Sequence, residues 1–304
     1  MNAATVQRTN VTLHPDRTRV LLRPFLLPNE PRARKICAQV MALPESEVHT
    51  LWERVQAEFG ERHAKTREFL RRRFEQARPC LGSDEKLSQE RELLLGAYFS
   101  HEYSLEAAAL FNPSIVPHPD QSDLLPGTLR FILSLRATGE GHISSITFRT
   151  GFLDAQCNIT INAPTRYCLE PAQVPNVSFE KNLFERKLRE LGLVGDFTRQ
   201  TLQHLGETFT LEQLHAAVSR AAEHLGARDR QTEAVARKTL MLAQSNYEVQ
   251  FAPDSRLSER VLFPVTPSQS NGIEDARFVR FQNDDGTWTY YATYTAYDGK
   301  MVLP

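Results

Sequence analysis

The 304-residue sequence lacks the features that mark several classes of protein. No apolar run approaches the roughly 18 residues of a transmembrane helix. The N-terminus, MNAATVQRTNVTLHPDR, has no apolar core of a secretory signal. The formal net charge is −1, so the basic excess of a general nucleic-acid or acidic-membrane binder is missing. These absences predict a protein that binds neither nucleic acid nor a membrane.

Cysteine is also scarce, which bears on metal binding and on the cellular compartment. The four cysteines lie far apart and form no Cys-x-x-Cys pair. Zinc sites and disulfide frameworks have recognisable cysteine spacings, so neither is expected here. The sequence therefore predicts a reduced, cytoplasmic protein with no bound metal and no cofactor.

The remaining composition is typical of a globular protein. Hydrophobic residues make up 41% of the chain and charged residues 24%, both ordinary values. A length of 304 residues allows one large domain or two modest ones with a real core.

Hydrophobic spacing predicts a helical N-terminal region. Residues 11–25 are expected to be extended. Apolar residues then recur at helical spacing over 48–74, and another helix is predicted at 88–110. We therefore expect an N-terminal strand plus a helical region over residues 1–104.

The second part of the chain is expected to be mainly β-structure. Helical patterns return over 183–246, and strands resume at 260–264. Residues 105–304 are therefore expected to form a β domain with a helical insertion at about 180–250. Strands joined by short glycine-containing turns are predicted at 129–136, 142–149 and 152–162.

The clearest local signal is a hairpin near the end of the sequence. Arg277–Gln282 leads into Asp285-Gly286, a favourable pair for a tight turn, and Thr287–Tyr297 returns. Asp298-Gly299 marks a second turn, so a β-meander is predicted.

A charged segment, Glu274-Asp275-Ala276-Arg277, precedes this hairpin. On an extended backbone Glu274 and Asp275 should face opposite sides, whereas Asp275 and Arg277 should share a face. An acid catalyst beside an arginine makes sense where the arginine binds substrate, because a nearby cation lowers the pKa of a carboxyl group. A surface ion pair at the start of a strand is the alternative that these residues leave open.

Arg136 and Arg149 each end a strongly apolar predicted strand. An arginine in such a place needs an anion, a carboxylate or water, so a structural salt bridge and an anionic or sugar ligand are both open. Between them, GEGHISS at 139–145 lacks the ending of a P-loop and lies between strands. His142 has no partner at metal-ligand spacing, and a hydrogen-bonding role is more typical.

Aromatic residues alternate along TWTYYATYTAYDG at 287–299. Most are expected to belong to a core, although aromatic rings also stack on sugars. The alternation alone does not choose between these roles for Tyr294.

Taken together, these segments resemble glycoside hydrolase family 130, the β-mannoside phosphorylases and related β-mannosidases. The resemblance covers roughly residues 105–162 and 258–304. Ala276 departs from the family's segment, which has proline at that position. The segments that carry the resemblance are Asn112-Pro113, LSLRA at 133–137, GIEDARFV at 272–279 and YYATYTAYDG at 290–299.

The resemblance implies a five-bladed β-propeller with the site at one end of its central funnel and the helical regions as additions. One hairpin follows Asp275, where the family has several further blades. The resemblance therefore also implies a C-terminally truncated chain.

The same resemblance implies roles for individual residues. Asp275 matches the proton donor, which acts through a sugar hydroxyl while inorganic phosphate attacks the anomeric carbon with inversion. To donate, Asp275 needs an environment that raises its pKa. Asn112 and Arg136 match positions that contact the mannosyl unit, and Arg277 is expected to bind phosphate or a sugar hydroxyl. Further substrate contacts are expected from His142, Ser144, Arg149, Glu274 and Tyr294.

The expected activity is phosphorolysis of a β-mannoside oligosaccharide to α-mannose 1-phosphate, with inorganic phosphate as co-substrate. This is the reaction of a glycosyltransferase-type glycoside phosphorylase. Alternatives are an inverting β-mannosidase and a non-catalytic carbohydrate-binding or interaction protein. Assembly into a homo-oligomer is left open.

Overall fold

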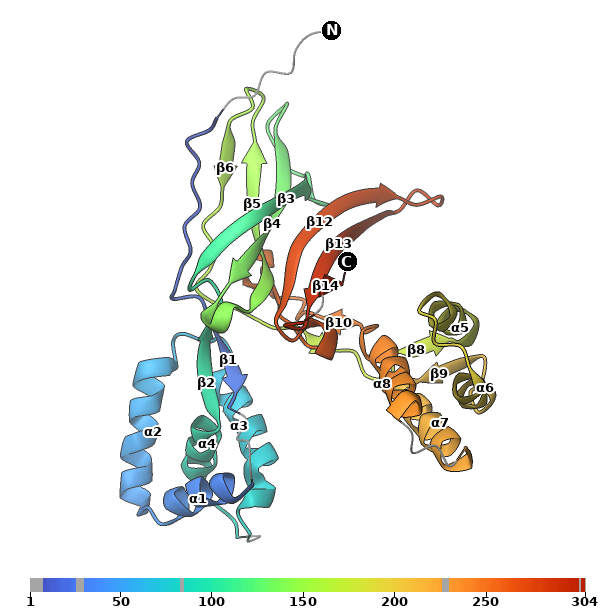
Figure 1. Cartoon of the computed structure of the whole chain (residues 1–304). Helices are drawn as coiled ribbons and strands as arrows, with labels where there is room; N and C mark the ends of the chain where they lie inside the picture. The colour runs from blue at the N-terminus through green and yellow to red at the C-terminus, as the bar shows by residue number, and fades with distance from the viewer. Residues whose placement is uncertain (1–7, 26–29, 83–84, 226–229, 301, 304) are drawn as a thin grey trace. The chain divides into compact units, whose positions relative to one another are not determined.

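A computed structural model describes residues 8–25, 30–82, 85–225, 230–300 and 302–303 (Figure 1). Residues 1–7, part of the N-terminal segment in which no secretory signal is predicted, lie outside the described residues. The chain forms two compact units, each assembled from separate stretches of sequence. The first comprises Met1–Glu170, Ser255–Leu262 and Glu274–Tyr294, and the second comprises Pro171–Asp254, Phe263–Ile273 and Thr295–Pro304.

Four helices form the N-terminal part of the first unit. The apolar spacing over 48–74 falls on two helices separated by a break at 60–65. It buries Val48, Trp52, Leu70 and Phe74, and Trp52 and Phe74 are each 2% exposed. Two of the helices approach so closely at Gly96 that a β-carbon there would lie 2.0 Å from the carbonyl oxygen of Leu70. The helices are α1 (Glu30–Met41), α2 (Glu45–Phe59), α3 (Thr66–Ala77) and α4 (Gln89–Tyr98), with a 3-10 turn, η1 (Arg78–Cys80), after α3.

The helical prediction for residues 88–110 is correct only in its first half. Helix α4 ends at Tyr98, and the chain continues as strand β2 (Ser100–Ser104). This strand pairs antiparallel with β1 (Val20–Pro24), from Val20 opposite Ser104 to Pro24 opposite Ser100. Backbone pairing with a distant segment therefore overrides the local helical pattern.

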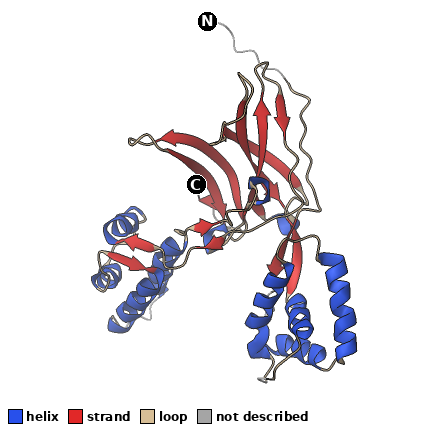
Figure 2. Ribbon diagram, turned by 180° about the vertical axis from the view of Figure 1, so that it is seen from behind, coloured by secondary structure: helices blue, strands red, loops and turns tan. Residues whose placement is uncertain are grey.

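The largest sheet has eight strands, whose main path runs β14-β13-β12-β5-β4-β3, while β6 and β11 also pair with β5. β4 and β5 pair antiparallel from Leu129 opposite Leu153 to Thr138 opposite Ser144. In the first unit, Figure 2 shows the long strands of this sheet together, apart from the helical group that contains α1 to α4 and the β1–β2 pair. The strands are β3 (Ala109–Pro117), β4 (Leu129–Thr138), β5 (Ser144–Leu153), β6 (Ile159–Ile161), β11 (Val261–Leu262), β12 (Gly272–Gln282), β13 (Trp288–Tyr297) and β14 (Val302–Leu303).

The five-bladed β-propeller expected from the family resemblance is wrong for the described residues. These residues form a mixture of helices and sheets, with one dominant sheet and neither a closed barrel nor a repeated blade. The physical reason lies in strand pairing. β12 does not open a separate blade but lies next to β5, so strands before and after the helical block share one sheet.

Local strand predictions hold better than the global one. β4 and the hairpin of β12 and β13 lie where the sequence places them. The predicted break near Gly151 is absent, because β5 continues through it to Leu153. A β-carbon at Gly151 would lie 2.3 Å from the carbonyl oxygen of Thr160 in β6. Glycine there allows close packing and does not make a turn.

The second unit is built around a helical core that includes Phe184, Leu188, Phe209 and Leu214. The predicted helical block over 183–246 is therefore confirmed, although a short strand interrupts it. The helices are α5 (Lys181–Glu190), α6 (Asp196–Gln203), α7 (Leu211–His224) and α8 (Arg230–Gln244), and the short strands are β7 (Ala172–Gln173), β8 (Ser178–Glu180), β9 (Thr208–Thr210) and β10 (Val249–Gln250). β8 pairs with β9, and β7 pairs with β10.

Candidate functional site

Five residues predicted for the site lie in one cluster of the first unit, which we call the Asp275 cluster: Asn112 on β3, Arg136 on β4, and Glu274, Asp275 and Arg277 on β12. The side-chain amide of Asn112 donates a hydrogen bond to Asp275 Oδ1. Arg136 Nη1 lies 3.3 Å from the same oxygen, and Arg136 Nη2 donates to Glu274 Oε1 at 2.6 Å. Arg277 Nη1 donates to the backbone carbonyl oxygen of Asn112 at 2.9 Å.

Unusual backbone geometry positions the two residues at the centre of the cluster. Asn112 and Asp275 have φ angles of 51° and 53°, in the left-handed region that side chains with a β-carbon rarely adopt. At Asn112 the β3–β4 register shifts between Phe111 and Ser114, which marks a β-bulge. Bulges re-aim side chains, and strained residues gather at functional sites. The backbone therefore turns both side chains toward each other.

The alternation expected for Glu274 and Asp275 is wrong. Both carboxylates contact the guanidinium of Arg136. The left-handed φ of Asp275 breaks the extended geometry on which the alternation depends. Arg277, which was expected to share a face with Asp275, contacts the backbone carbonyl of Asn112 at the rim of the cluster.

Arg136 is held in place by two residues in addition to the carboxylates. Its Nε donates to Ser144 Oγ at 3.0 Å, and Ser144 is fully buried. Its guanidinium also lies over the ring of Phe111, 4.8 Å from the ring centre. Phe111 is a residue that the sequence reasoning missed, although it directly precedes Asn112. Arg136 therefore has little freedom to move away from the carboxylates.

The electrostatics of the cluster keep Asp275 ionised. Burial raises the pKa of Asp275, but hydrogen bonds from Asn112 and Arg136, with the charges of Arg136 and Arg277, outweigh it and lower the pKa below its usual value. The raised pKa expected for a proton donor is therefore not found. Asp275 Oδ1 accepts both hydrogen bonds.

Arg149 lies in a different environment from Arg136. It is 3% exposed, and its Nη2 donates to Glu106 Oε1 at 2.7 Å. Arg19 Nε donates to the same oxygen at 2.9 Å, and both Arg19 and Glu106 are fully buried. The sequence left two roles open for Arg149, a structural salt bridge and the binding of an anionic or sugar ligand. The structure shows the salt bridge, in this buried triad, and Arg149 does not join the Asp275 cluster. The sequence reasoning missed Arg19 and Glu106.

The two remaining predicted residues lie at the surface. His142 is exposed in the 3-10 turn η2 (Glu140–His142), between β4 and β5, with a φ of 61°. Tyr294 lies on β13 and is 38% exposed.

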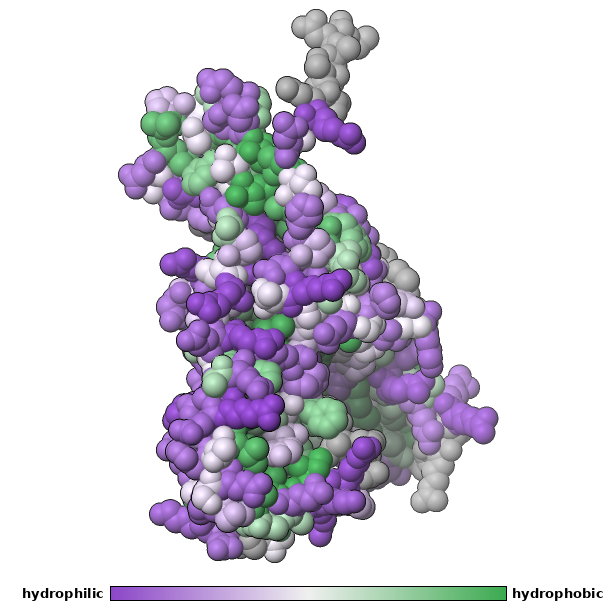
Figure 3. Space-filling model, turned by 90° about the vertical axis from the view of Figure 1, so that its left-hand side faces the viewer, coloured by the Kyte–Doolittle hydropathy of each residue, from purple (hydrophilic) through white to green (hydrophobic). Residues whose placement is uncertain are grey.

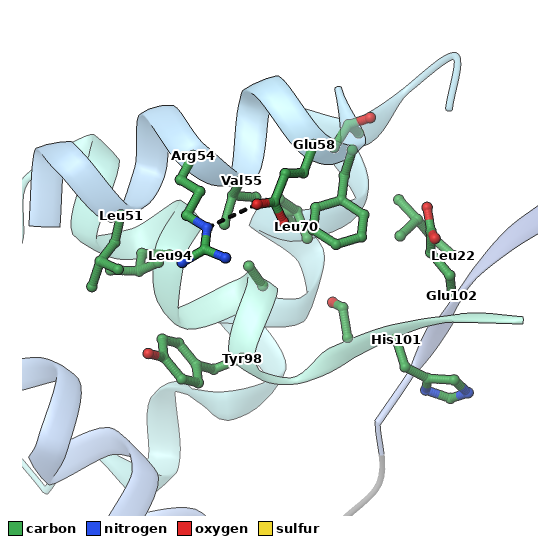
Figure 4. A pocket seen from close by; sticks show the side chains of 14 residues that line it. Leu22, Leu51, Arg54, Val55, Glu58, Leu70, Leu94, Tyr98, His101 and Glu102 are labelled. Atoms are coloured by element: carbon green, nitrogen blue, oxygen red, sulfur yellow. Dashed lines mark hydrogen bonds and ion pairs between the residues drawn. The ribbon is translucent and has the colours of Figure 1, made fainter. Parts of the chain in front are cut away.

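A separate cavity of about 360 Å³ lies in the N-terminal part of the first unit (Figure 4). Arg54 and Glu58 at this cavity form an ion pair at 2.8 Å, so together they offer no net charge to select an ion. The size and apolar lining of the cavity suit an apolar part of a ligand. None of the predicted site residues lines the cavity. The apolar lining comes from Leu22, Leu51, Val55, Phe59, Leu70, Leu94, Ala97 and Tyr98.

Other classes of site are not found in the described part of the chain. Among those residues no group of three or more histidine, cysteine, aspartate or glutamate side chains is placed to hold a metal ion. No described helix is long and apolar enough to cross a membrane. The face in Figure 3 is largely hydrophilic, with apolar side chains in limited patches.

Comparisons of this chain with protein-family models, with curated proteins and with solved structures found no match.

Proposed function

We propose that the Asp275 cluster is the active site of an enzyme that acts on β-mannosides, by inverting phosphorolysis to α-mannose 1-phosphate. The observation that carries this proposal is the contact between Asn112 and Asp275, which are 163 residues apart in the sequence. The family resemblance selects both residues, together with Arg136, from the sequence alone. Their meeting on strained backbone supports a shared chemical role.

The cluster contains the groups that this reaction needs. Asn112 and Arg136 offer amide and guanidinium donors, which suit sugar hydroxyl groups. Arg277, exposed at the rim, offers a guanidinium for the phosphate dianion. In the reaction a phosphate oxygen forms a bond to the anomeric carbon as the glycosidic C–O bond breaks. The leaving oxygen takes a proton that comes from Asp275 through a sugar hydroxyl.

Phosphate also bears on the protonation of Asp275. Arg136 and Arg277 help to lower the pKa of Asp275. A bound dianion neutralises part of that positive charge, so the pKa of Asp275 rises when phosphate is present. The co-substrate would thus help to prepare the acid that the reaction requires.

One observation favours a second function, inverting hydrolysis of β-mannosides. The carboxylate of Asp275 is the ionised form, with two donors on one oxygen. An ionised carboxylate is suited to act as a general base toward water. In this case water attacks the anomeric carbon and gives a proton to Asp275, while the leaving oxygen takes a proton from the second carboxyl group of the cluster, Glu274. Free mannose then replaces mannose 1-phosphate.

The proposed function also includes a reduced, cytoplasmic location. All four cysteines, Cys37, Cys80, Cys157 and Cys168, are free thiols. Paired cysteines would be typical of an oxidising compartment.

The experiment that tests the proposal follows product formation from β-1,4-mannobiose with and without inorganic phosphate. Phosphorus NMR identifies mannose 1-phosphate, and sugar chromatography identifies free mannose. Phosphorolysis predicts α-mannose 1-phosphate in amounts that depend on phosphate concentration. Release of mannose alone, independent of phosphate, would instead support hydrolysis. Binding of the sugar without either product would contradict both enzymatic functions and support a non-catalytic carbohydrate-binding protein.

A further inference from the structure

β3 and the hairpin of β12 and β13 contact each other although they are not neighbours in the large sheet. β4 and β5 lie between β3 and β12 in the strand order. Phe278 N–H nevertheless donates a hydrogen bond to Ser114 Oγ at 2.9 Å, and the Tyr290 hydroxyl donates to the carbonyl oxygen of Pro117 at 2.7 Å. The hairpin is therefore bound to β3 outside the Asp275 cluster as well as within it.

Ser114 is the residue at which regular pairing of β3 with β4 resumes. The register shifts between Phe111 and Ser114, and Ser114 then lies opposite Ser134. Buried Ser134 donates its hydroxyl to the carbonyl oxygen of Ser114 at 3.4 Å. The backbone of Ser114 thus belongs to the sheet, while its side-chain oxygen reaches the hairpin. A bulge re-aims side chains in this way.

The bond to Ser114 fixes the β12 backbone three residues after Asp275. The ring of Phe278 also meets that of buried Phe148 on β5 edge to face, with ring centres 6.0 Å apart. Asp275 has a φ of 53°, and a residue in this conformation persists only where the surrounding contacts determine it. Ser114 provides such a contact to the backbone itself, whereas Arg277 and Tyr290 reach β3 through their side chains.

We propose that Ser114 is a positioning residue for the reaction at the Asp275 cluster: by accepting the Phe278 N–H, it sets the place of the Asp275 carboxylate beside Asn112. The inference rests on the proposed function, since it concerns the same site. Asn112 lies two residues before Ser114 on β3 and contacts Asp275 directly. One strand therefore holds both the carboxylate and the backbone that carries it.

Removal of the Ser114 hydroxyl should slow the reaction. Ser114→Ala leaves the Phe278 N–H without its acceptor, so the Asp275 carboxylate is no longer fixed beside Asn112. A misplaced catalytic group lowers turnover, and we expect kcat for β-1,4-mannobiose with phosphate to fall about tenfold. The Michaelis constant for the sugar should stay close to that of wild type, because Asn112 and Arg136 keep their places on β3 and β4. Ser114→Thr keeps a hydroxyl and should restore kcat.

The pKa of Asp275 is a second readout, which the loss of a purely structural bond would not change. Burial raises this pKa, whereas hydrogen bonds from Asn112 and Arg136, with the charges of Arg136 and Arg277, lower it more strongly. The other charged group beside Asp275 is Glu274, which pairs with Arg136. The pKa therefore depends on how closely the Asp275 carboxylate approaches its donors.

Carbon NMR of the side-chain carboxyl groups measures this pKa in the 304-residue chain without any turnover. The Asp275 signal is the one that disappears in Asp275→Asn. In Ser114→Ala the hydrogen bonds to Asp275 weaken, so its pKa should rise toward the ordinary value for aspartate. Ser114→Cys has nearly the size of serine but is a weak acceptor. It should shift the pKa in the same direction, and it provides the test if the alanine variant does not fold.

Tyr290→Phe is the matched control, because it also removes a hydroxyl hydrogen bond between β3 and the hairpin, but at Pro117. It should leave the pKa of Asp275 and kcat unchanged. An unchanged pKa of Asp275 in Ser114→Ala and Ser114→Cys, or an equal shift in Tyr290→Phe, would overturn the inference, whether or not the wild-type chain is active. A wild-type chain that forms neither product contradicts the proposed function, and the NMR titration still decides whether Ser114 positions Asp275.

Discussion

The buried triad of Arg19, Glu106 and Arg149 leads to the sharpest stability prediction. Glu106 is fully buried and accepts hydrogen bonds from both guanidinium groups, at 2.9 and 2.7 Å, and from the backbone N–H of Asp16 at 3.2 Å. Glu106→Gln removes the negative charge and leaves two buried cations without compensation. The glutamine NH₂ group would also face a donor, either Asp16 N–H or a guanidinium. Breaking such a buried pair costs about 3–5 kcal/mol in the free energy of unfolding.

Removal of Arg149 should cost less than removal of the charge on Glu106. Arg149→Met leaves Arg19 and Glu106 as a balanced pair, and eliminates the excess positive charge of the triad. The losses are the bonds from Arg149 to Glu106, to Thr147 Oγ1 at 3.1 Å and to the Phe148 carbonyl at 3.0 Å. We expect a decrease of about 1–2 kcal/mol. The Michaelis constant for the mannoside should not change, because the hydrogen bonds of Arg149 go to Thr147, Phe148 and Glu106, which do not belong to the Asp275 cluster.

Urea unfolding followed by tryptophan fluorescence measures both variants. The chain has two tryptophans, Trp52 and Trp288, and both belong to the first unit, so the signal reports on the unit that contains the triad. Glu58→Gln is the control, because it breaks an exposed ion pair with Arg54 and should change little. A loss below about 1 kcal/mol for Glu106→Gln, or a larger loss for Arg149→Met than for Glu106→Gln, would refute the reasoning.

Three further predictions concern the first unit. Gly96→Ala should lower its free energy of unfolding by about 1–3 kcal/mol in the same fluorescence assay, because the new β-carbon would lie 2.0 Å from the Leu70 carbonyl oxygen; unchanged stability would contradict that close approach. Burial lowers the pKa of His63 despite its bond to Glu102, so the unfolded state binds the proton first, and stability should fall as the pH drops below about 6.5. His63→Gln should reduce that slope, and an identical slope would assign it to other groups. Ser144→Ala should lower kcat/KM about tenfold by freeing Arg136, with an unchanged melting temperature as the control; full activity would show that Ser144 does not position Arg136.

Local patterns in the sequence predicted the elements that depend on local forces. The spacing of Val48 and Trp52 places them inside the helical core, and Asp285-Gly286 predicts the turn between β12 and β13. Residues 88–110 show where such patterns stop, because β2 forms by pairing with β1, some 80 residues earlier in the sequence.

The members of the candidate site were predicted in part, but their geometry was not. The family resemblance selected Asn112, Arg136 and Asp275, and the structure brings them together. The left-handed φ of Asp275 carries no signal in the sequence, and it determines that Glu274 and Asp275 share Arg136. The lowered pKa of Asp275 follows from the hydrogen bonds that it accepts from Asn112 and Arg136 and from the charges of Arg136 and Arg277.

Long-range pairing explains the errors of the sequence analysis. Arg149 carries the same sequence features as Arg136, and the difference between them is a buried partner, Glu106, 43 residues away. The propeller was expected from short segments that resemble one family, whereas the pairing of β12 with β5 is a property of the whole sheet. Short motifs predict which residues lie close together in space better than they predict the fold that positions them.

The central claim, that Asp275 is the catalytic acid of a mannoside-cleaving site, is tested most directly by the turnover of Asp275→Asn on β-1,4-mannobiose with phosphate. The account predicts a decrease in kcat of about 10²–10⁴-fold for Asp275→Asn, while calorimetry still detects sugar binding by this variant. The control is Asp284→Asn, which changes an exposed carboxylate in the turn of the same hairpin and should keep wild-type turnover. Wild-type turnover in Asp275→Asn would contradict the account.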